Sequence, residues 1–164
     1  AGSVLQVVST TKTDTFSVSS LASNTSASIT GLSASITPTS TSSKILVMYS
    51  VCLSAGISNR QATAAVVIER NGTEIKTADA EGSRGTVNSF FSVNANDDDN
   101  CTAIATSNFI DEPLSTNALT YQVLLYNVGS ASESYACNRT WGDANSNNFR
   151  TRSTSSITVM EIAG

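Results

Sequence analysis

Residues 45–53 read Ile-Leu-Val-Met-Tyr-Ser-Val-Cys-Leu, and this stretch decides the fold. Successive side chains of a β-strand point to opposite faces of a sheet, so every second residue of the stretch shares one face. Leu46 and Met48 make the first half of the other face apolar as well. This pattern is typical of a central strand that is covered on both sides. The first face carries Ile45, Val47, Tyr49, Val51 and Leu53.

Strand-like segments recur along the rest of the chain and are separated by turn residues. Residues 32–36 alternate apolar and hydroxyl side chains, which is the period of two expected for a strand with one buried face. Residues 119–128 are apolar on both faces, like residues 45–53. No segment shows the composition and periodicity of a helix. The other predicted strands are residues 4–8, 15–18, 64–69, 73–77, 87–93, 102–110, 135–141 and 157–162.

Asn71-Gly72 lies between two of these strands and predicts a β-hairpin with a two-residue turn. A type I′ turn needs positive φ at both central residues, which Asn and Gly tolerate. Such a turn places Ile68 opposite Ile75, a favourable pair. It also places Glu69 opposite Glu74, which is unfavourable unless a neighbouring cation screens the two carboxylates.

The chain is polar through hydroxyl groups rather than through charges. Its 164 residues include 28 Ser and 21 Thr, whereas charged residues make up 13%, about half the usual share. Thr favours strands, Ser favours turns, and both are poor helix formers. We therefore predict an all-β chain, an antiparallel β-sandwich or jelly roll of about nine or ten strands. No linker divides it, so residues 1–164 are predicted to form a single domain.

Charge and hydropathy exclude several kinds of partner. The net charge is −4, and the nine Lys and Arg residues form no cluster in the sequence. Nucleic-acid binding needs clustered cations that displace counterions from phosphates, so we expect no nucleic-acid partner. No run of 18 apolar residues occurs, so we expect no membrane span.

The residue types needed for most catalytic chemistry are scarce. The chain has no histidine, so Ser-His-acid and Cys-His arrangements are excluded and a zinc site is not expected. Carboxylates are few and lie mostly in predicted turns. We expect no enzymatic activity and no cofactor. Cys52, Cys101 and Cys137 form no CxxC pair, which leaves two alternatives: three buried thiols, or one disulfide with one remaining thiol.

The candidate binding residues lie on two polar loops and on the predicted strand that precedes the second loop. Asp97, Asp98 and Asp99 are weak calcium candidates, because calcium takes oxygen ligands on loops, although their spacing is not that of a known calcium loop. The alternative for them is a solvated acidic loop. Trp141, the sole tryptophan, stands beside an Asn-rich loop, and exposed aromatics next to amides can bind sugar rings. The alternative for Trp141 is a core or interface position. The glycan or partner candidates are Tyr135, Trp141, Asn145, Asn147 and Asn148.

A series of segments resembles small β domains of phage tail-fibre and virion-surface proteins. Each segment is short and strand-like, but together they cover nearly the whole chain in the expected order. In sequence order they are Gly2-Ser3-Val4-Leu5-Gln6-Val7-Val8, residues 29–38 (Ile-Thr-Gly-Leu-Ser-Ala-Ser-Ile-Thr-Pro), residues 42–47, Glu69-Arg70-Asn71-Gly72-Thr73-Glu74-Ile75, residues 120–123, Asn138-Arg139 and residues 156–162.

The resemblance implies a compact β-sandwich or jelly roll on the surface of a virion, often as a trimer. The expected function is that of a non-enzymatic bacteriophage structural protein: a short fibre, a knob or a capsid decoration protein. Its expected partners are further copies of itself and other virion proteins. The alternative is a receptor- or carbohydrate-binding adhesin domain of a tail fibre, with a host surface glycan as partner.

Overall fold

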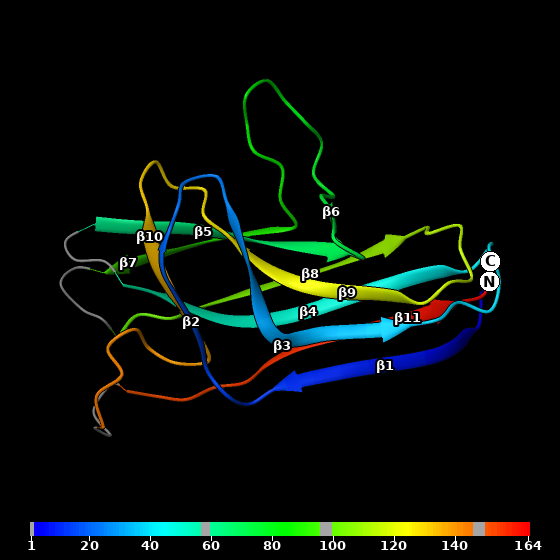
Figure 1. Cartoon of the computed structure of the whole chain (residues 1–164), viewed down its shortest axis with the longest axis horizontal. Coiled ribbons are helices and arrows are strands. Elements are labelled where there is room, and N and C mark those ends of the chain that lie inside the picture. Colours follow the sequence, from blue (N-terminus) through cyan, green and yellow to red (C-terminus); the bar gives the residue numbers. More distant parts are fainter. Residues whose placement is uncertain (1, 57–59, 96–99, 146–149) are drawn as a thin grey trace.

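The protein is built from strands and loops. The computed structural model describes residues 2–56, 60–95, 100–145 and 150–164. These ranges contain no helix that could cross a membrane. The strands in them (Figure 1) are β1 (Val4–Lys12), β2 (Phe16–Leu21), β3 (Ser26–Ile36), β4 (Lys44–Ala55), β5 (Arg60–Arg70), β6 (Thr73–Ile75), β7 (Ser89–Ala95), β8 (Ala103–Asp111), β9 (Leu119–Tyr126), β10 (Glu133–Cys137) and β11 (Ser155–Ile162).

The strands form two antiparallel sheets that share one core. The first sheet has the order β1-β11-β4-β10-β2, and β8 pairs with the other edge of β4. The second sheet has the order β3-β9-β5-β6, and β7 also pairs with β5. All pairings are antiparallel, so the predicted all-β sandwich is confirmed.

Three strand positions of the sandwich are each filled by two strands that lie end to end. In the first sheet, β11 and β10 pair with successive parts of β4. On their far side, β1 pairs with β11 and β2 pairs with β10. In the second sheet, β7 and β6 pair with successive parts of β5. Counting each such pair once gives eight positions in two sheets of four. Their order is that of a jelly roll, so this prediction is also confirmed. The described residues thus form eleven strands, where the sequence predicted about nine or ten.

The core lies between the sheets and is lined by alternate residues, as the sequence predicted for residues 45–53. Ile45, Val47, Val51 and Leu53 of β4 are fully buried, and Tyr49 is nearly so. They pack against the inward faces of β5 and β9 in the second sheet. Burial of this apolar surface is the main stabilising contribution, at roughly 25 cal/mol per Å² removed from water.

The Asn71-Gly72 hairpin forms as predicted. Both residues have positive φ, 49° and 82°, and Ile68 and Ile75 pair across the strands. Glu69 pairs with Glu74, and Lys76 Nζ lies 2.9 Å from the Glu74 carboxylate. The cation therefore offsets the repulsion between the two carboxylates.

The second face of β4 differs from the prediction. Leu46 stands in a row of apolar side chains that crosses four strands, because Val7 pairs with Met160, Met160 with Leu46, and Leu46 with Ile110. We call Val7, Met160, Leu46 and Ile110 the outer row. Val7 is 53% exposed and Ile110 is 46% exposed. The second covering layer that the sequence predicted is therefore not supplied by the described part of the chain.

Asp111 joins the two sheets through polar contacts. Its carboxylate accepts hydrogen bonds from Arg70 Nη1 of β5, at 2.6 and 2.8 Å, and from the Tyr121 hydroxyl of β9, at 2.6 Å. Burial, together with the adjacent Asp111 carboxylate, raises the pKa of Tyr121. The Tyr121 hydroxyl therefore stays protonated and acts as a donor.

The chain termini meet at one end of the sandwich (Figure 1), where Ala163 N donates to Ser3 O at 2.9 Å. Beside them the carboxylate of Glu161 is fully buried. It accepts hydrogen bonds of 2.6 to 2.7 Å from Gln6 Nε2, Thr39 N, Thr39 Oγ1 and Ser43 Oγ. Burial alone would raise the pKa of Glu161, but these donors outweigh it and lower the pKa to about 2.

Glu161→Gln should lower the free energy of unfolding by about 2 kcal/mol at neutral pH, because an amide NH₂ would face donors that now bind a carboxylate oxygen. The folded-state pKa lies below the ordinary value of 4.5, so the stabilisation from ionised Glu161 is complete above about pH 4.5 and is lost as the pH falls toward 2. Chemical denaturation across this range should show the difference between wild type and variant shrinking. The exposed Glu112→Gln is the control, and a difference that does not change with pH would contradict the assignment.

Candidate functional site

The longest interruption of a strand position creates the candidate site. β10 pairs with β4 as far as Cys137 opposite Leu53, and β11 resumes with Ser156 opposite Ser50. Between them the chain leaves the sheet and returns. We call residues 139–154 the arginine loop; it is described except at residues 146–149. It lies at the end of the sandwich opposite the termini (Figure 1).

A buried asparagine fixes the base of the arginine loop. Asn138 is fully buried and has a φ of 63°, a left-handed conformation that Asn adopts more readily than most residues. Its Nδ2 donates to Lys12 O and Asp14 O, both at 2.9 Å, and its Oδ1 accepts from Ser155 Oγ at 2.6 Å. These bonds tie both ends of the loop to the end of β1, so the base of the loop is held in one place.

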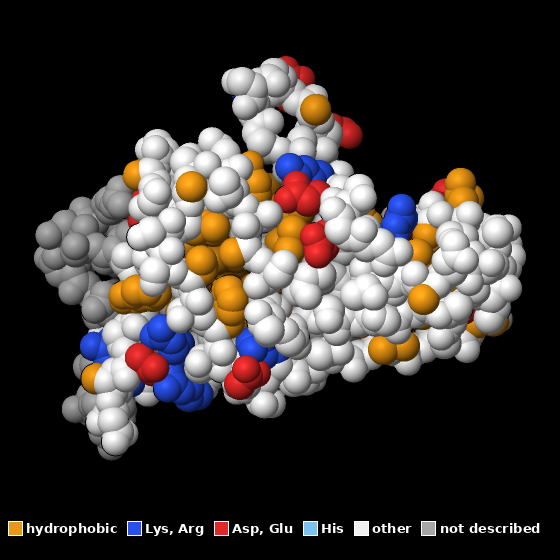
Figure 2. Space-filling view, in the orientation of Figure 1, with side chains coloured by type: hydrophobic (Ala, Val, Ile, Leu, Met, Phe, Trp, Pro, Cys, Tyr) orange, Lys and Arg blue, Asp and Glu red, His pale blue; other side chains and the backbone are white. Residues whose placement is uncertain are grey.

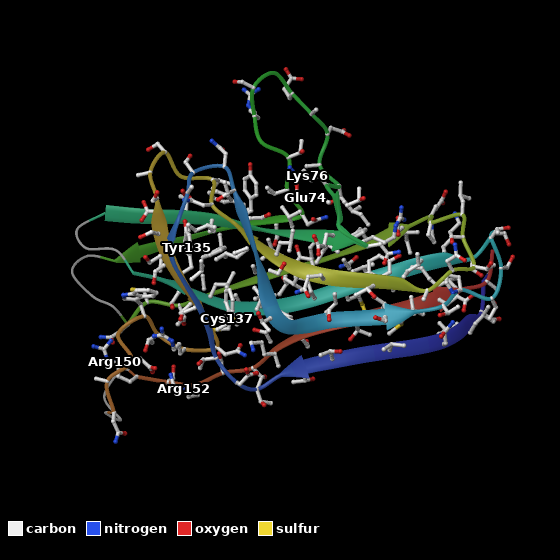
Figure 3. All side chains as sticks on the ribbon, viewed as in Figure 1. Glu74, Lys76, Tyr135, Cys137, Arg150 and Arg152 are labelled. Atoms are coloured by element: carbon white, nitrogen blue, oxygen red, sulfur yellow. The ribbon has the colours of Figure 1, made fainter. Side chains whose placement is uncertain are left out.

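Three arginines come together on this loop. Arg139 and Arg152 face each other in an isolated antiparallel bridge, and Arg150 is two residues away from Arg152. Figure 3 labels Arg150 and Arg152 on the part of the loop that leads to β11, and Figure 2 shows blue side chains gathered at this end. The sequence indicated no cluster of cations, because Arg139 becomes a neighbour of the other two only when the loop closes.

A pocket of about 290 Å³ opens beside these arginines. It combines cationic, acidic, amide and hydroxyl groups, all from one loop. Its described lining consists of Asp143, Ala144, Asn145, Arg150, Thr151 and Arg152.

Two of the three guanidinium groups already have partners. Arg152 Nη1 donates to Asp143 Oδ1, and Arg139 Nε lies 3.9 Å from Asp143 Oδ2. The hydrogen bond from Arg152 lowers the pKa of Asp143, with a smaller contribution from Arg139. Arg139 Nη1 also donates to Thr140 O at 3.1 Å and Trp141 O at 2.6 Å. Arg150 differs from both: its Nη1 is buried and has no hydrogen-bond partner among the described residues.

Trp141 is half-buried beside the pocket and is not part of its described lining. Its indole packs against Gly56, where an added Cβ would lie 2.1 Å from the ring, and the Arg139 guanidinium lies 5.4 Å from the ring centroid. These contacts cover part of the indole. Trp141 thus packs against neighbouring residues, and its contact with a sugar stays a prediction.

The structure separates the other candidate residues. Asn145 lines the pocket, whereas Asn147, Asn148, Asp97, Asp98 and Asp99 lie outside the described residues. Within the described ranges, no group of three His, Cys, Asp or Glu side chains could hold a metal ion. Cys52, Cys101 and Cys137 form no disulfide in the structure.

Tyr135 is a correction to the predicted site, because it is fully buried and cannot contact a surface ligand. It stands on β10 between the two sheets (Figure 3), and its hydroxyl donates to Thr63 O at 3.0 Å and Asn127 Oδ1 at 3.1 Å. Tyr135 shares this inward face of β10 with Glu133 and Cys137, and the acidic residue on so short a strand left the buried face unclear from the sequence.

Comparisons with known proteins give no family for the chain: no family model and no curated protein matches it. Among solved structures, the chain is similar to the structure of infectious bursal disease virus, Gx strain, with 16% identity and a TM-score of 0.41. The match covers 96% of this chain and 41% of that chain, so this chain spans less than half of its length. The jelly-roll assignment therefore rests on the strand pairing of this chain itself.

Gly56→Ala should displace Trp141, because the new methyl group would overlap the indole. Overpacking of this kind lowers the free energy of unfolding by about 1–3 kcal/mol. Trp141 is the sole tryptophan, so a red shift of the intrinsic fluorescence would report its movement toward water. Gly85→Ala is the matched control, because nothing lies within 4 Å of a Cβ placed there. Equal emission maxima and melting temperatures for the two variants would show that the position of the Trp141 indole does not depend on the absence of a side chain at Gly56.

Proposed function

We propose that this chain is a non-enzymatic bacteriophage virion structural protein: a short fibre, a knob or a capsid decoration protein on the particle surface. It acts by assembling with further copies of itself, as a trimer, and with other virion proteins. The observation that carries the proposal is the outer row, a line of apolar side chains on the outside of a complete sandwich. The virion assignment is supported by the resemblance of the strand segments to phage fibre and virion-surface domains.

The outer row is suited to contact between copies because its face is almost without charge. The outward side chains around the row are mainly apolar or hydroxyl groups, such as Ser9, Thr158 and Met48. Lys44 stands at the margin of the face, and its Nζ lies 2.6 Å from the Glu112 carboxylate. A chain with net charge −4 repels its own copies, and an approach through a neutral face keeps that repulsion small.

The size of the face also fits an interface. β4 and β8 pair along residues 45–53 and 103–111, nine residues each, which at about 3.4 Å per residue is roughly 30 Å. Four strands about 4.8 Å apart span roughly 19 Å, so the flat footprint is about 570 Å². Protruding side chains add to this footprint. The face therefore approaches the roughly 800 Å² per partner of a standard interface.

Abundant hydroxyl groups support the same role. They pair across strands on the surface, as Ser9 Oγ does with Thr158 Oγ1 at 2.8 Å and Ser35 Oγ with Thr120 Oγ1 at 2.8 Å. Such bonds involve no charge, so salt screening does not weaken them. A surface of this kind suits a particle exposed to changing ionic strength.

Ile110→Asp should dissociate the assembly, because it places a charge in the outer row. Size-exclusion chromatography with light scattering at micromolar concentration should give the mass of an oligomer for the wild type and of a monomer for the variant. The melting temperature of the isolated sandwich should change little, since exposed substitutions usually alter stability by about 0.5 kcal/mol or less. The measured mass also gives the number of copies.

The matched control is Leu114→Asp, at an apolar residue that is 75% exposed and lies outside the strands. A wild type that is monomeric, or an Ile110→Asp variant that stays as oligomeric as Leu114→Asp, would contradict assembly through the outer row. Antibody labelling of intact particles would then test the location on a virion separately.

A further inference from the structure

We propose that three copies of the chain assemble around an axis parallel to the strands, with their first sheets facing inward, so that Val7 of one copy contacts Ile110 of the next. This inference rests on the proposed assembly through the outer row and specifies how that row is used. The contact is heterologous, because each copy offers its β1 edge to one neighbour and its β8 edge to the other. The second sheets then lie on the outside of the trimer.

The directions of the strands allow such a ring to close. β1, β11, β4 and β8 lie side by side and each neighbouring pair is antiparallel, so β1 and β8 run in opposite directions. Copies related by rotation about an axis along the strands keep the same strand directions. The β1 edge of one copy therefore meets the β8 edge of the next in antiparallel orientation, which is how neighbouring strands already pair within each sheet.

Both edges are open to this contact. In the described ranges, β1 pairs with β11 alone and β8 pairs with β4 alone, so one side of each strand is not used in the sheet. Exposed sheet edges are usually protected by charged side chains, proline or bulges. β8 has none of these from Ala103 to Ile110, and its register with β4 is unbroken. A closed ring covers both edges at once, whereas face-to-face packing of two copies leaves them open.

The width of the sheet fits three copies. Four strands about 4.8 Å apart span roughly 19 Å, so three such faces enclose a triangle whose centre lies about 5.5 Å from each face. Packed sheets stand about 10 Å apart, so side chains reach about 5 Å from each sheet and fill this centre. Leu46 and Met160, the half-buried middle of the row, would face the centre. Four copies would put the centre about 9.5 Å from each face, which side chains would leave empty.

The surroundings of the row suit burial in a trimer. The next row across the same four strands carries no charge and consists of Ser9, Thr158, Met48 and Asn108. Ser9 Oγ and Thr158 Oγ1 already pair with each other at 2.8 Å. The segment of residues 76–88 projects from the body (Figure 1) between β6 and β7 of the second sheet, and the second sheets of neighbouring copies diverge at each corner of the triangle. This segment therefore has room outside the ring.

The test replaces the apolar contact by an ion pair. Ile110→Asp alone should dissociate the trimer, and adding Val7→Lys to the same chain should restore it, with an affinity between copies at least about tenfold higher. Within one copy the two residues stand three strand spacings apart, roughly 14 Å, so the restoration requires a neighbouring copy. The matched control, Val7→Asp with Ile110→Asp, should stay monomeric. Light scattering after size exclusion gives the masses, and the restored trimer should weaken as salt rises.

The outcomes separate this inference from the proposed function. A monomeric wild type, or an Ile110→Asp variant that stays assembled, would overturn assembly through the outer row and the ring with it. Dissociation by Ile110→Asp without restoration by Val7→Lys, or restoration with the mass of two copies, would overturn the ring alone.

Amide hydrogen exchange gives a second measurement that needs no ion pair. Amides along β1 and β8 should exchange more slowly in the wild-type trimer than in the Ile110→Asp monomer, because the ring covers both edges. Amides along β3, the edge strand of the outward second sheet, should exchange equally in both. Slower exchange at β3, or equal exchange at β1 and β8, would overturn the inward orientation of the first sheet.

Discussion

The backbone hydrogen bonding of β4 is the constraint on which the rest of the structure depends. One edge of this strand is occupied along its length by β8, and the other edge is shared by β11 and β10. The register with β11 and β8 aligns Leu46 with Met160 and Ile110, which creates the outer row. The point at which β11 gives way to β10 creates the arginine loop. Both candidate surfaces are therefore consequences of how a single strand is paired.

Alternation of side chains made most of the fold predictable. The buried face of residues 45–53, the Asn71-Gly72 hairpin and the all-β class follow from local patterns, because a period of two and a turn residue are visible in sequence. The division of single strand positions into two strands was not predictable. It depends on which edge is already occupied, and that is a property of the whole sheet.

The candidate site was predictable only in part. Asn145 lies on the loop that the sequence indicated, whereas Trp141, predicted at the end of a strand, lies on that loop because β10 ends at Cys137. Tyr135 was misplaced because a single aromatic residue on a short strand gives little sign of its direction. The arginines were missed because their proximity arises from the pairing of Arg139 with Arg152. The burial of Glu161 was not predictable for the same reason, because it depends on hydrogen-bond donors from Gln6, Thr39 and Ser43, which are distant in sequence.

The meeting of both chain ends at the pole opposite the arginine loop has a geometric consequence. A tether attached to either end would leave from the same pole, so the loop would point away from whatever anchors the domain. The same closeness means that a short peptide could join the two ends and new ends could be opened elsewhere, giving a circularly permuted chain with the same sandwich. The segment between β6 and β7, which projects from the body in Figure 1, is the natural place for that opening.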